Sequence, residues 1–401
     1  MTDKLHRNRI QIPGAIPSAL MWGLAILPAM LAIPQATAQT FKVVYTFTGG
    51  LDGGGPWGTP LYSGGILYGT AFSGGNPAAG DYGTIYQYDP TFLIGTYLYD
   101  FAGQPMDGSA PMGGLATDGF GDFFGTTTQG GFSLDGTIYE YSGGTEFVVA
   151  NFNGHNGKAP EGGLIMDPVG NLYGTTSSGG ANDCGTVFAF SAFGSLVEIY
   201  NFGNDKNDGI GPASSLVFQK GVLYGVTTEG GQYGWGTVFS VDIKTKTETV
   251  LYNFQGKKNG GTPVGGLALD AHGDLWGTAS AGGSSHGNAG NGVVFKLNTK
   301  SLKYSLVHTF SGTDGSQPMA ALVPDGQGNF YGTTYIGGAL GYGTVFELNA
   351  GGTLTILYSF TDGTDGAYPY AGVALDSSGN VYGAATQGGQ YGWGTLFEIT
   401  P

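Results

Sequence analysis

One unit of about fifty residues is repeated seven times between Phe41 and Pro401, and this repetition constrains the fold more than any other feature of the chain. Each unit carries a phenylalanine marker, and successive markers are 50 to 56 residues apart. The markers are Phe47, Phe101, Phe152, Phe202, Phe254, Phe310 and Phe360. Repeats of this length are typical of propellers and solenoids, in which each unit buries its apolar face against its neighbours.

A turn string, Asp/Asn-Gly-x-x-Pro, follows every marker. It occupies residues 52–56, 107–111, 156–160, 208–212, 259–263, 314–318 and 365–369. An Asp or Asn side chain can accept hydrogen bonds from the nearby backbone, glycine tolerates positive φ, and proline fixes φ where no N–H is needed. An aromatic-Gly pair, a Gly-Gly pair and a run such as Gly-Thr-Val-Phe at residues 343–346 complete each unit.

Four short runs of strand composition lie between these turns in each unit, for example residues 249–254, 266–270, 274–278 and 292–297. Each run is about five residues long, is rich in Val, Leu, Tyr and Phe, and is bounded by Gly, Asn or Asp. Seven units of four strands predict an all-β fold, a seven-bladed β-propeller with four short antiparallel strands per blade.

The first predicted strand contains Val43, Tyr45 and Phe47 and precedes the first complete unit. We expect it to become the outermost strand of the last blade, beside the strand at residues 394–399, because this closure removes two open sheet edges. The alternative is an open array with unpaired ends.

Individual units, such as residues 170–180 (GNLYGTTSSGG) followed by residues 185–188 (GTVF), resemble the GloVer tandem repeat of exported bacterial proteins. The resemblance covers nearly all of the chain after residue 38. It implies propeller-type repeats and supplies no activity and no catalytic residue.

Residues 1–38 have the features of a secretory signal peptide. Lys4, Arg7 and Arg9 form a basic start, residues 20–33 are mostly apolar, and residues 36–38 (Ala-Thr-Ala) resemble a cleavage site. An uncleaved membrane anchor is the alternative, although two prolines and the shortness of the apolar stretch count against it. We therefore expect a secreted, periplasmic or extracellular protein without membrane insertion, whose residues 39–401 form a single propeller domain.

The charge of the chain limits its partners. The formal charge of −15 becomes −17 when Lys4, Arg7 and Arg9 are removed together with Asp3, and no arginine remains after that. Arginine is the residue best suited to a bidentate grip on phosphate, so nucleic acid and anionic lipid are poor candidates. We expect a monomer that binds a glycan or a protein surface.

No catalytic constellation is recognisable in the sequence. His155, His272, His286 and His308 lie in different units, and none has the spacing of metal ligands. The paired carboxylates, Asp205 with Asp208 and Asp362 with Asp365, lie in turn strings. We interpret them as turn caps, with calcium binding as the alternative. No metal, no cofactor and no catalytic residue is predicted.

The candidate ligand-binding residues lie in two kinds of loop expected on one face of the ring. The residue after each conserved proline differs between units, being Trp57, Met112, Glu161, Ala213, Val264, Met319 or Tyr370. A fixed frame would thus present different side chains near the channel, and Trp57, Glu161 and Tyr370 are the candidates there. Units four and seven share a Gly-Gly-Gln-Tyr-Gly-Trp-Gly-Thr loop that contains Tyr233, Trp235, Tyr391 and Trp393.

Aromatic rings flanked by glycine and glutamine suit stacking on sugars in water. The competing interpretation is that these rings pack across blades or cover glycine-rich backbone. The sequence therefore favours a non-enzymatic binding module for glycans or cell-surface partners. The alternatives are an extracytoplasmic lyase or hydrolase, with Glu161 as the best single candidate residue, and a purely structural protein of an envelope or matrix.

Overall fold

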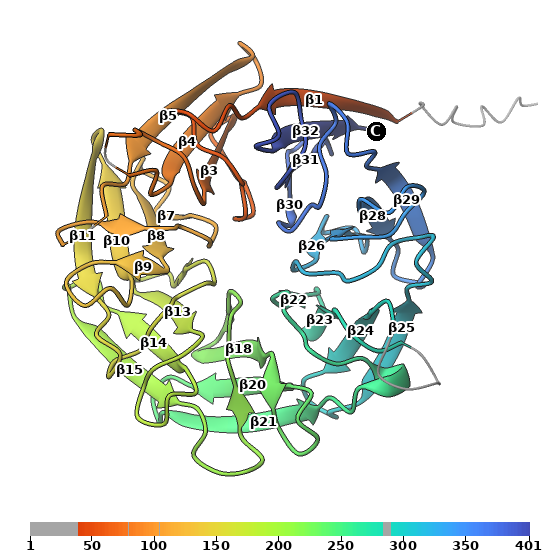
Figure 1. Cartoon of the computed structure of the whole chain (residues 1–401). Coiled ribbons are helices and arrows are strands. Elements are labelled where there is room, and N and C mark those ends of the chain that lie inside the picture. Colours follow the sequence, from red (N-terminus) through yellow and green to blue (C-terminus); the bar gives the residue numbers. More distant parts are fainter. Residues whose placement is uncertain (1–38, 79, 104, 284–289) are drawn as a thin grey trace, which may run out of the picture. The chain divides into compact units, whose positions relative to one another are not determined.

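The structure, a computed structural model, describes residues 39–401 apart from residues 79, 104 and 284–289, and Ala38–Pro401 forms one compact unit. Seven four-stranded antiparallel sheets stand in a ring (Figure 1). This confirms the predicted seven-bladed β-propeller. Among the described residues, the only helical element is the short 3-10 helix η1 (Lys257–Asn259). The expected signal peptide lies outside the described residues.

The first four blades follow one another along the chain, and within each blade the strands run in order from the innermost to the outermost. Blade 1 contains β2 (Leu61–Ser63), β3 (Ile66–Ala71), β4 (Thr84–Asp89) and β5 (Ile94–Asp100). Blade 2 contains β7 (Ala116–Thr117), β8 (Phe123–Thr127), β10 (Thr137–Ser142) and β11 (Thr145–Asn151). Blade 3 contains β12 (Ile165–Met166), β13 (Leu172–Thr176), β14 (Thr186–Phe190) and β15 (Leu196–Asn201). Blade 4 contains β17 (Val217–Gln219), β18 (Val222–Thr227), β20 (Thr237–Asp242) and β21 (Thr247–Asn253).

The remaining three blades complete the ring in the same order. Blade 5 contains β22 (Ala268–Leu269), β23 (Asp274–Ala279), β24 (Val293–Asn298) and β25 (Tyr304–Thr309). Blade 6 contains β26 (Val323–Pro324), β27 (Phe330–Thr334), β28 (Thr344–Leu348) and β29 (Leu354–Ser359). Blade 7 contains β30 (Val373–Leu375), β31 (Val381–Ala385), β32 (Thr395–Thr400) and β1 (Thr40–Thr46). Two short ladders lie in the loops, β6 (Gly108–Ser109) with β9 (Gln129–Gly130) and β16 (Gly209–Ile210) with β19 (Glu229–Gly230).

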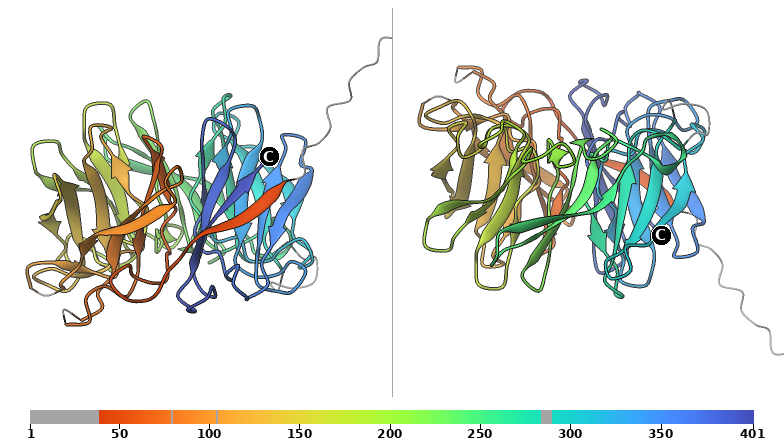
Figure 2. Two further views of the ribbon diagram at one scale, coloured as in Figure 1. Left: turned by 90° about the horizontal axis from the view of Figure 1, so that it is seen from above. Right: turned by 90° about the horizontal axis from the view of Figure 1, so that it is seen from below.

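The N-terminal strand closes the ring, as predicted. β1 pairs antiparallel with β32, from Thr40 opposite Thr400 to Thr46 opposite Thr395. Figure 1 shows the red β1 on the outer side of the blue β32, and Figure 2 shows both strands from the side. Blade 7 is therefore built from the two ends of the described chain, and β1 covers the edge of β32 that would otherwise be open.

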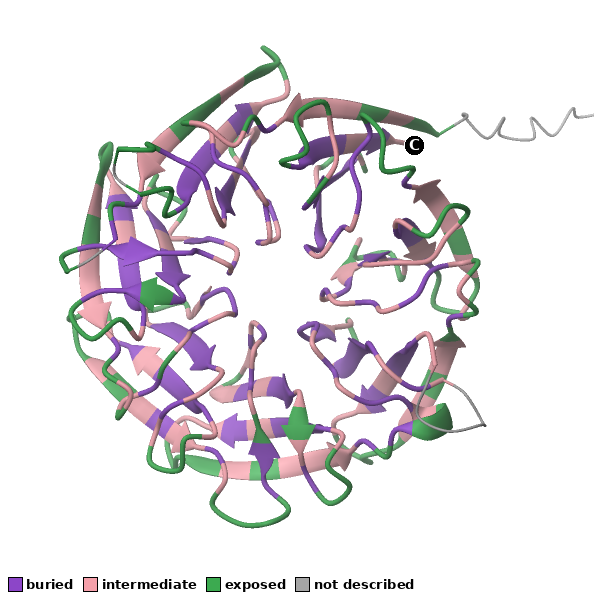
Figure 3. Cartoon of the chain, in the orientation of Figure 1, coloured by how far each residue is buried: buried purple, intermediate pink, exposed green. Residues whose placement is uncertain are grey.

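The marker phenylalanines form the centre of the packing between strands and blades. Their exposed fractions lie between 0% and 2%. Phe152, for example, meets Phe188 of the next blade edge to face, with ring centroids 5.1 Å apart, an arrangement that aromatic pairs prefer. Figure 3 shows the same pattern around the ring, with the middle strands of each blade buried and the outer strands and loops partly exposed.

The innermost strands are shorter than predicted. The run at residues 266–270 contributes only Ala268–Leu269 to the ladder. The reason is the close approach of neighbouring blades, because a Cβ atom on Gly265 would collide with the main-chain carbonyl of Ala320 in the next blade. The first residues of each inner run therefore lie outside the ladder and line the centre of the ring; most are glycines, but blades 4 and 6 have Ser214–Ser215 and Ala320–Ala321 there.

Threonine hydroxyls join neighbouring blades near the centre. In blade 3 the buried Thr175 hydroxyl donates to the main-chain carbonyl of Ser214, 3.0 Å away in the chain leading into blade 4. Thr70, Thr126, Thr278 and Thr333 make the equivalent bond to Gly113, Gly162, Ala320 and Ala371. The threonine after each aromatic-Gly pair thus holds the next blade in register, and only Val226 and Ala384 replace it.

A second set of contacts joins the outer strands. In each contact, the residue six positions before a marker phenylalanine lies against a residue of the neighbouring blade. This second residue stands two positions before the marker of that neighbouring blade. Phe41 stacks on Tyr358 with ring centroids 3.5 Å apart, and Tyr304 stacks on Tyr252 at 4.1 Å. Aromatic stacking at these two contacts buries apolar surface between adjacent blades.

We call these contacts between outer strands the rim contacts. In two of them, the residue six positions before the marker is a glutamate instead of an aromatic residue. Glu146 lies beside Tyr99 and Asp107, and Oε1 of Glu146 is buried without a hydrogen-bond partner. Burial, together with the nearby negative charge of Asp107, raises the pKa of Glu146 to about 8. Glu248 repeats the arrangement beside Asp208, and the same causes raise its pKa to about 8. Both glutamates consequently hold a proton at neutral pH.

Candidate functional site

Two loops of every unit meet on one face of the ring, as expected from the sequence. The turn string leads from the outer strand of one blade to the inner strand of the next, and the Gly-Gly loop joins the second strand to the third. The two loops hydrogen-bond to each other, for example at Lys158 with Ser178 and at Ala367 with Gln387. This face, the loop face, therefore carries a continuous hydrogen-bonded frame.

The aspartates of the turn strings cap their own turns. Asp365 Oδ2 accepts hydrogen bonds from the Tyr358 hydroxyl at 3.0 Å and from the Thr361 amide at 2.8 Å. Burial alone would raise the pKa of Asp365, but these hydrogen bonds hold it below its ordinary value of 3.8. Asp208 is bound in the same way by the Tyr200 hydroxyl and the Asn204 amide. Asp208 and Asp365 thus cap their turns, as the sequence interpretation expected. The described residues contain no cluster of three or more His, Cys, Asp or Glu arranged to hold a metal ion.

The residue before each conserved proline fixes the direction of the loop. All seven adopt positive φ, namely Gly55, Ala110, Ala159, Gly211, Thr262, Gln317 and Tyr368. Their amides donate to a carbonyl of the preceding Gly-Gly loop, as Tyr368 does to Tyr342 at 2.9 Å. A left-handed residue reverses the chain locally, so the residue after the proline points towards the centre of the ring.

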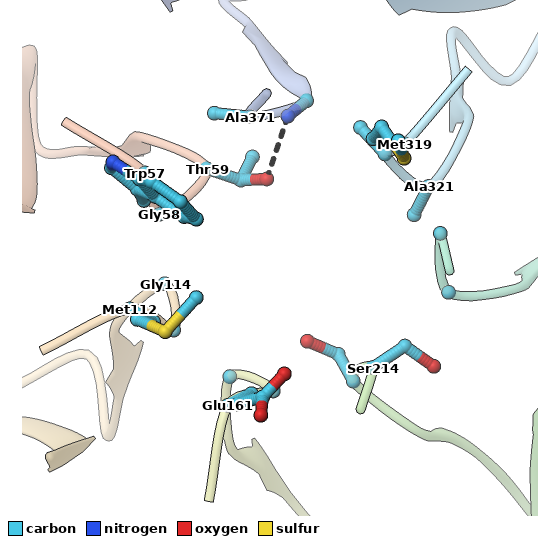
Figure 4. Close-up of a pocket in the computed structure, with 18 of the residues that line it drawn as sticks. Trp57, Gly58, Thr59, Met112, Gly114, Glu161, Ser214, Met319, Ala321 and Ala371 are labelled. Carbon is cyan, nitrogen blue, oxygen red and sulfur yellow. Dashed lines mark hydrogen bonds between the residues drawn. The ribbon is translucent and has the colours of Figure 1, made fainter. Parts of the chain in front are cut away.

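The residues after the prolines meet around a central cavity of about 90 Å³. All seven line it, together with the two residues that follow each of them. Figure 4 shows Trp57, Met112, Glu161 and Met319 on different sides of this cavity. The structure thus places Trp57, Glu161 and Tyr370 where the sequence analysis expected them.

Aromatic rings crowd one side of the mouth. The ring of Trp57 lies 4.8 Å from that of Tyr370 and 5.3 Å from that of Phe72. Burial and then the negative charge of Glu161 raise the pKa of Tyr370 above its ordinary value of 10. The Tyr370 hydroxyl therefore keeps its proton at neutral pH and remains a hydrogen-bond donor.

Glu161 lies at the boundary between the mouth and a larger groove. Its Oε1 accepts a hydrogen bond of 2.8 Å from the Ser177 hydroxyl. The groove has a volume of about 530 Å³ and extends from Glu161 and Met112 over the loops of blades 1 to 3. Its other main side chains are Phe72, Tyr82, Gln129, Leu134 and Lys158. This volume falls in the range of about 300–1,000 Å³ that is usual for small-molecule sites.

The groove was not predicted from the sequence, although the repeat units contain a signal for it. The signal is the residue four positions after the aromatic of each aromatic-Gly pair. This residue is Ser or Thr in five units, and its hydroxyl donates to the main-chain carbonyl of the residue before the conserved proline. Phe72 and Tyr335 occupy this position in the other two units. Both rings lie beside the mouth, since Tyr335 is 6.1 Å from Tyr370 between ring centroids. The two departures from Ser or Thr mark the aromatic side of the site.

The four aromatic residues of the Gly-Gly loops are not brought to the mouth. Tyr233 and Tyr391 are 47% and 53% exposed, on blades 4 and 7 respectively. Trp393 packs on the backbone of Gly49 and Gly54 while remaining 44% exposed.

The half-buried Trp235 packs in the equivalent way on Gly261. Both indoles thus cover glycine backbone of the following turn string. A ligand-binding role of the two loops stays a prediction.

Comparisons with known proteins agree with this architecture. Virginiamycin B lyase from Staphylococcus aureus superposes with a TM-score of 0.58 at 14% sequence identity, covering 90% of this chain and 100% of that one. The GH74 enzyme of Niastella koreensis superposes with a TM-score of 0.52 at 18% identity, covering 79% of this chain and 46% of that one. At such identities the similarity concerns the fold alone.

A search of curated protein sequences gave no significant match. No helix among the described residues is long and apolar enough to cross a membrane. The model of the Gloeobacter/Verrucomicrobia repeat matches residues 32–168, 142–287 and 284–401. The chain therefore belongs to the Gloeobacter/Verrucomicrobia repeat family, as the resemblance of its units had indicated.

Proposed function

We propose that this propeller is an exported glycan-binding module whose binding site is the groove beside the channel mouth. The observation that carries the proposal is the composition of the groove. Phe72, Tyr82 and Leu134 offer apolar surface, while Gln129 and Glu161 offer amide and carboxylate groups. Sugars present apolar C–H faces and hydroxyl groups, and such mixed sites suit both.

Exposure in the groove also fits a ligand from solution. Tyr82 is 37% exposed and Leu134 is 47% exposed, so both are accessible without a rearrangement of the fold. The frame beneath them is fixed by main-chain bonds, such as that from the Ala110 amide to the Tyr82 carbonyl at 2.8 Å. A preformed site loses little conformational freedom on binding.

The acidic groups of the site favour binding over hydrolysis. Glu161 is the only carboxylate among the described residues that line the mouth or the groove. Most glycoside hydrolases use two carboxyl groups on either side of the scissile bond. Export is proposed on the basis of residues 1–38, whose sequence has the features of a signal peptide.

A glycan panel tests the proposal. Purified residues 39–401 would be compared with Phe72→Thr, which restores the residue type common in the sibling units, and with Glu161→Gln. We expect binding of at least one glycan by the wild type and a loss of about tenfold or more in affinity in each variant. A Tyr233→Ala, Tyr391→Ala double variant serves as the comparison for the loops of blades 4 and 7.

Three results would contradict the proposal. The first is a folded wild-type protein that binds no glycan. The second is binding that depends on Tyr233 and Tyr391 and not on Phe72. The third is the release of new reducing ends or unsaturated sugars during incubation, which would indicate the alternative of an extracytoplasmic hydrolase or lyase.

A further inference from the structure

The outer rim of the ring contains one exception to its own repeat. The residue six positions before each marker is Phe41, Gly95, Glu146, Leu196, Glu248, Tyr304 or Leu354. Only blade 1 has no side chain there, and the ring of Tyr45 lies directly on the Gly95 backbone. The contact that a side chain makes in other blades is therefore absent where blade 7 meets blade 1.

A notch of about 700 Å³ is present at this place. It is lined by Tyr45, Thr48, Leu51, Asp52, Gly95, Thr96 and Tyr97. Tyr97 is 45% exposed and Leu51 is 48% exposed. Tyr97 belongs to the outer strand β5, and Leu51 to the turn that leaves β1, so the notch lies at the seam where the N-terminal strand closes the ring.

The polar side of the notch is rich in acceptors. Asp52 Oδ2 is held by the Tyr45 hydroxyl at 3.0 Å and the Thr48 amide at 2.9 Å. The Thr48 hydroxyl also donates to Asp52 Oδ1. A carboxylate has about four acceptor positions on its two oxygens, so these three bonds leave Asp52 about one position for a further donor. The described residues of the lining include no lysine or histidine. An anionic ligand would therefore meet an uncompensated negative charge.

We propose that this notch is a second binding site, for a single neutral sugar unit. The C–H face of the sugar would lie on Tyr97 and Leu51, and one of its hydroxyl groups would donate to Asp52. A sugar carboxylate would be repelled by Asp52. The notch shares no lining residue with the groove at the mouth, so the two proposals stand independently.

Amide NMR of deuterated, ¹⁵N-labelled residues 39–401 tests the notch by location. The probes are methyl β-D-glucopyranoside, methyl β-D-galactopyranoside and methyl α-D-mannopyranoside, with glucuronic acid as the charged comparison. We expect at least one neutral glycoside to shift the amides of Gly95, Thr96 and Tyr97, and glucuronic acid to leave them unshifted. Binding in the groove would instead shift amides such as that of Gln129, which separates the two sites.

Two variants make the test decisive. Tyr97→Ala removes the exposed ring and Gly95→Leu introduces the residue of blades 3 and 6. Each is expected to weaken the shifts at Thr96 by about tenfold or more in apparent affinity. Tyr97→Ala leaves both Gly95 and Tyr45 in the chain, so it still tests the site if Gly95→Leu fails to fold. Phe193→Ala, which removes a side chain 98% exposed on a distant turn, is the matched control and should bind normally.

The proposal is overturned if none of the three neutral glycosides shifts these amides. It is equally overturned if folded Tyr97→Ala binds as the wild type does, or if Phe193→Ala weakens the shifts to the same extent.

Discussion

Replacing Glu146 and Glu248 by glutamine should make the propeller more stable in mildly alkaline solution. Each carboxyl has a pKa near 8 in the folded chain and an ordinary value of 4.5 when the chain is unfolded. Between these two pH values the folded chain binds more protons than the unfolded chain. Its free energy of unfolding therefore falls as the pH rises from 4.5 to 8, and the full contribution is present below pH 4.5.

The magnitude follows from the shift and from the position of the groups. One pKa unit corresponds to about 1.4 kcal/mol. Both side chains are only half-buried at the outer rim, so solvent screening reduces the effect, and we expect about 1–2 kcal/mol per site. Glutamine resembles the protonated glutamic acid in shape and stays neutral. At pH 8 the double variant should therefore exceed the wild type in stability by about 2–4 kcal/mol.

Urea unfolding followed by tryptophan fluorescence at pH 4.5, 6 and 8 measures this difference. Glu229→Gln, which removes one charge at an exposed position, controls for the general effect of net charge. The reasoning is refuted if the Glu146→Gln, Glu248→Gln variant shows the same stability difference from the wild type at all three pH values. It is also refuted if the control reproduces the pH dependence.

Three further perturbations have expected outcomes. Thr175→Val, which copies Val226 of blade 4, removes the hydroxyl that donates to the Ser214 carbonyl. The free energy of unfolding measured in urea should fall by about 1–2 kcal/mol. An unchanged free energy of unfolding would show that this bond between blades contributes nothing. Asp365→Ala should cost about 2–3 kcal/mol at pH 7 by calorimetry or urea unfolding. The deficit should shrink as the pH falls below 3.8 through the lowered pKa of Asp365, and a deficit of unchanged size in acid would contradict the role of the charge. Deletion of residues 39–46 exposes the edge of β32 and should produce oligomers in light scattering, while a stable monomer would contradict the closure by β1.

The repeat made the architecture predictable because each punctuating residue has a local physical reason. The Asp/Asn of the turn string caps the turn, the marker phenylalanine packs between blades, and the threonine after the aromatic-Gly pair bonds the next blade. Closure by the strand around Val43 was predictable as well, because one strand was left over before the first complete unit and the last unit lacked an outer strand.

The groove and the rim contacts were harder to anticipate, since they depend on how blades are juxtaposed. Phe72 is distant in sequence from Glu161, and nothing in either unit alone places them in the same groove. The raised pKa of Glu146 likewise depends on its burial between two blades and then on the charge of Asp107, which belongs to the turn before the blade. Aligning the seven units and asking which one breaks a local rule would have pointed to Phe72, Tyr335 and Gly95.

A crystal structure of residues 39–401 with a glycan identified by the panel tests the central claim most directly. The account predicts that the bound sugar lies in the groove, against Phe72 and Leu134, with a hydroxyl group within hydrogen-bond distance of Glu161. Sugar bound against Tyr233 or Tyr391 instead, with the groove empty, would contradict the account.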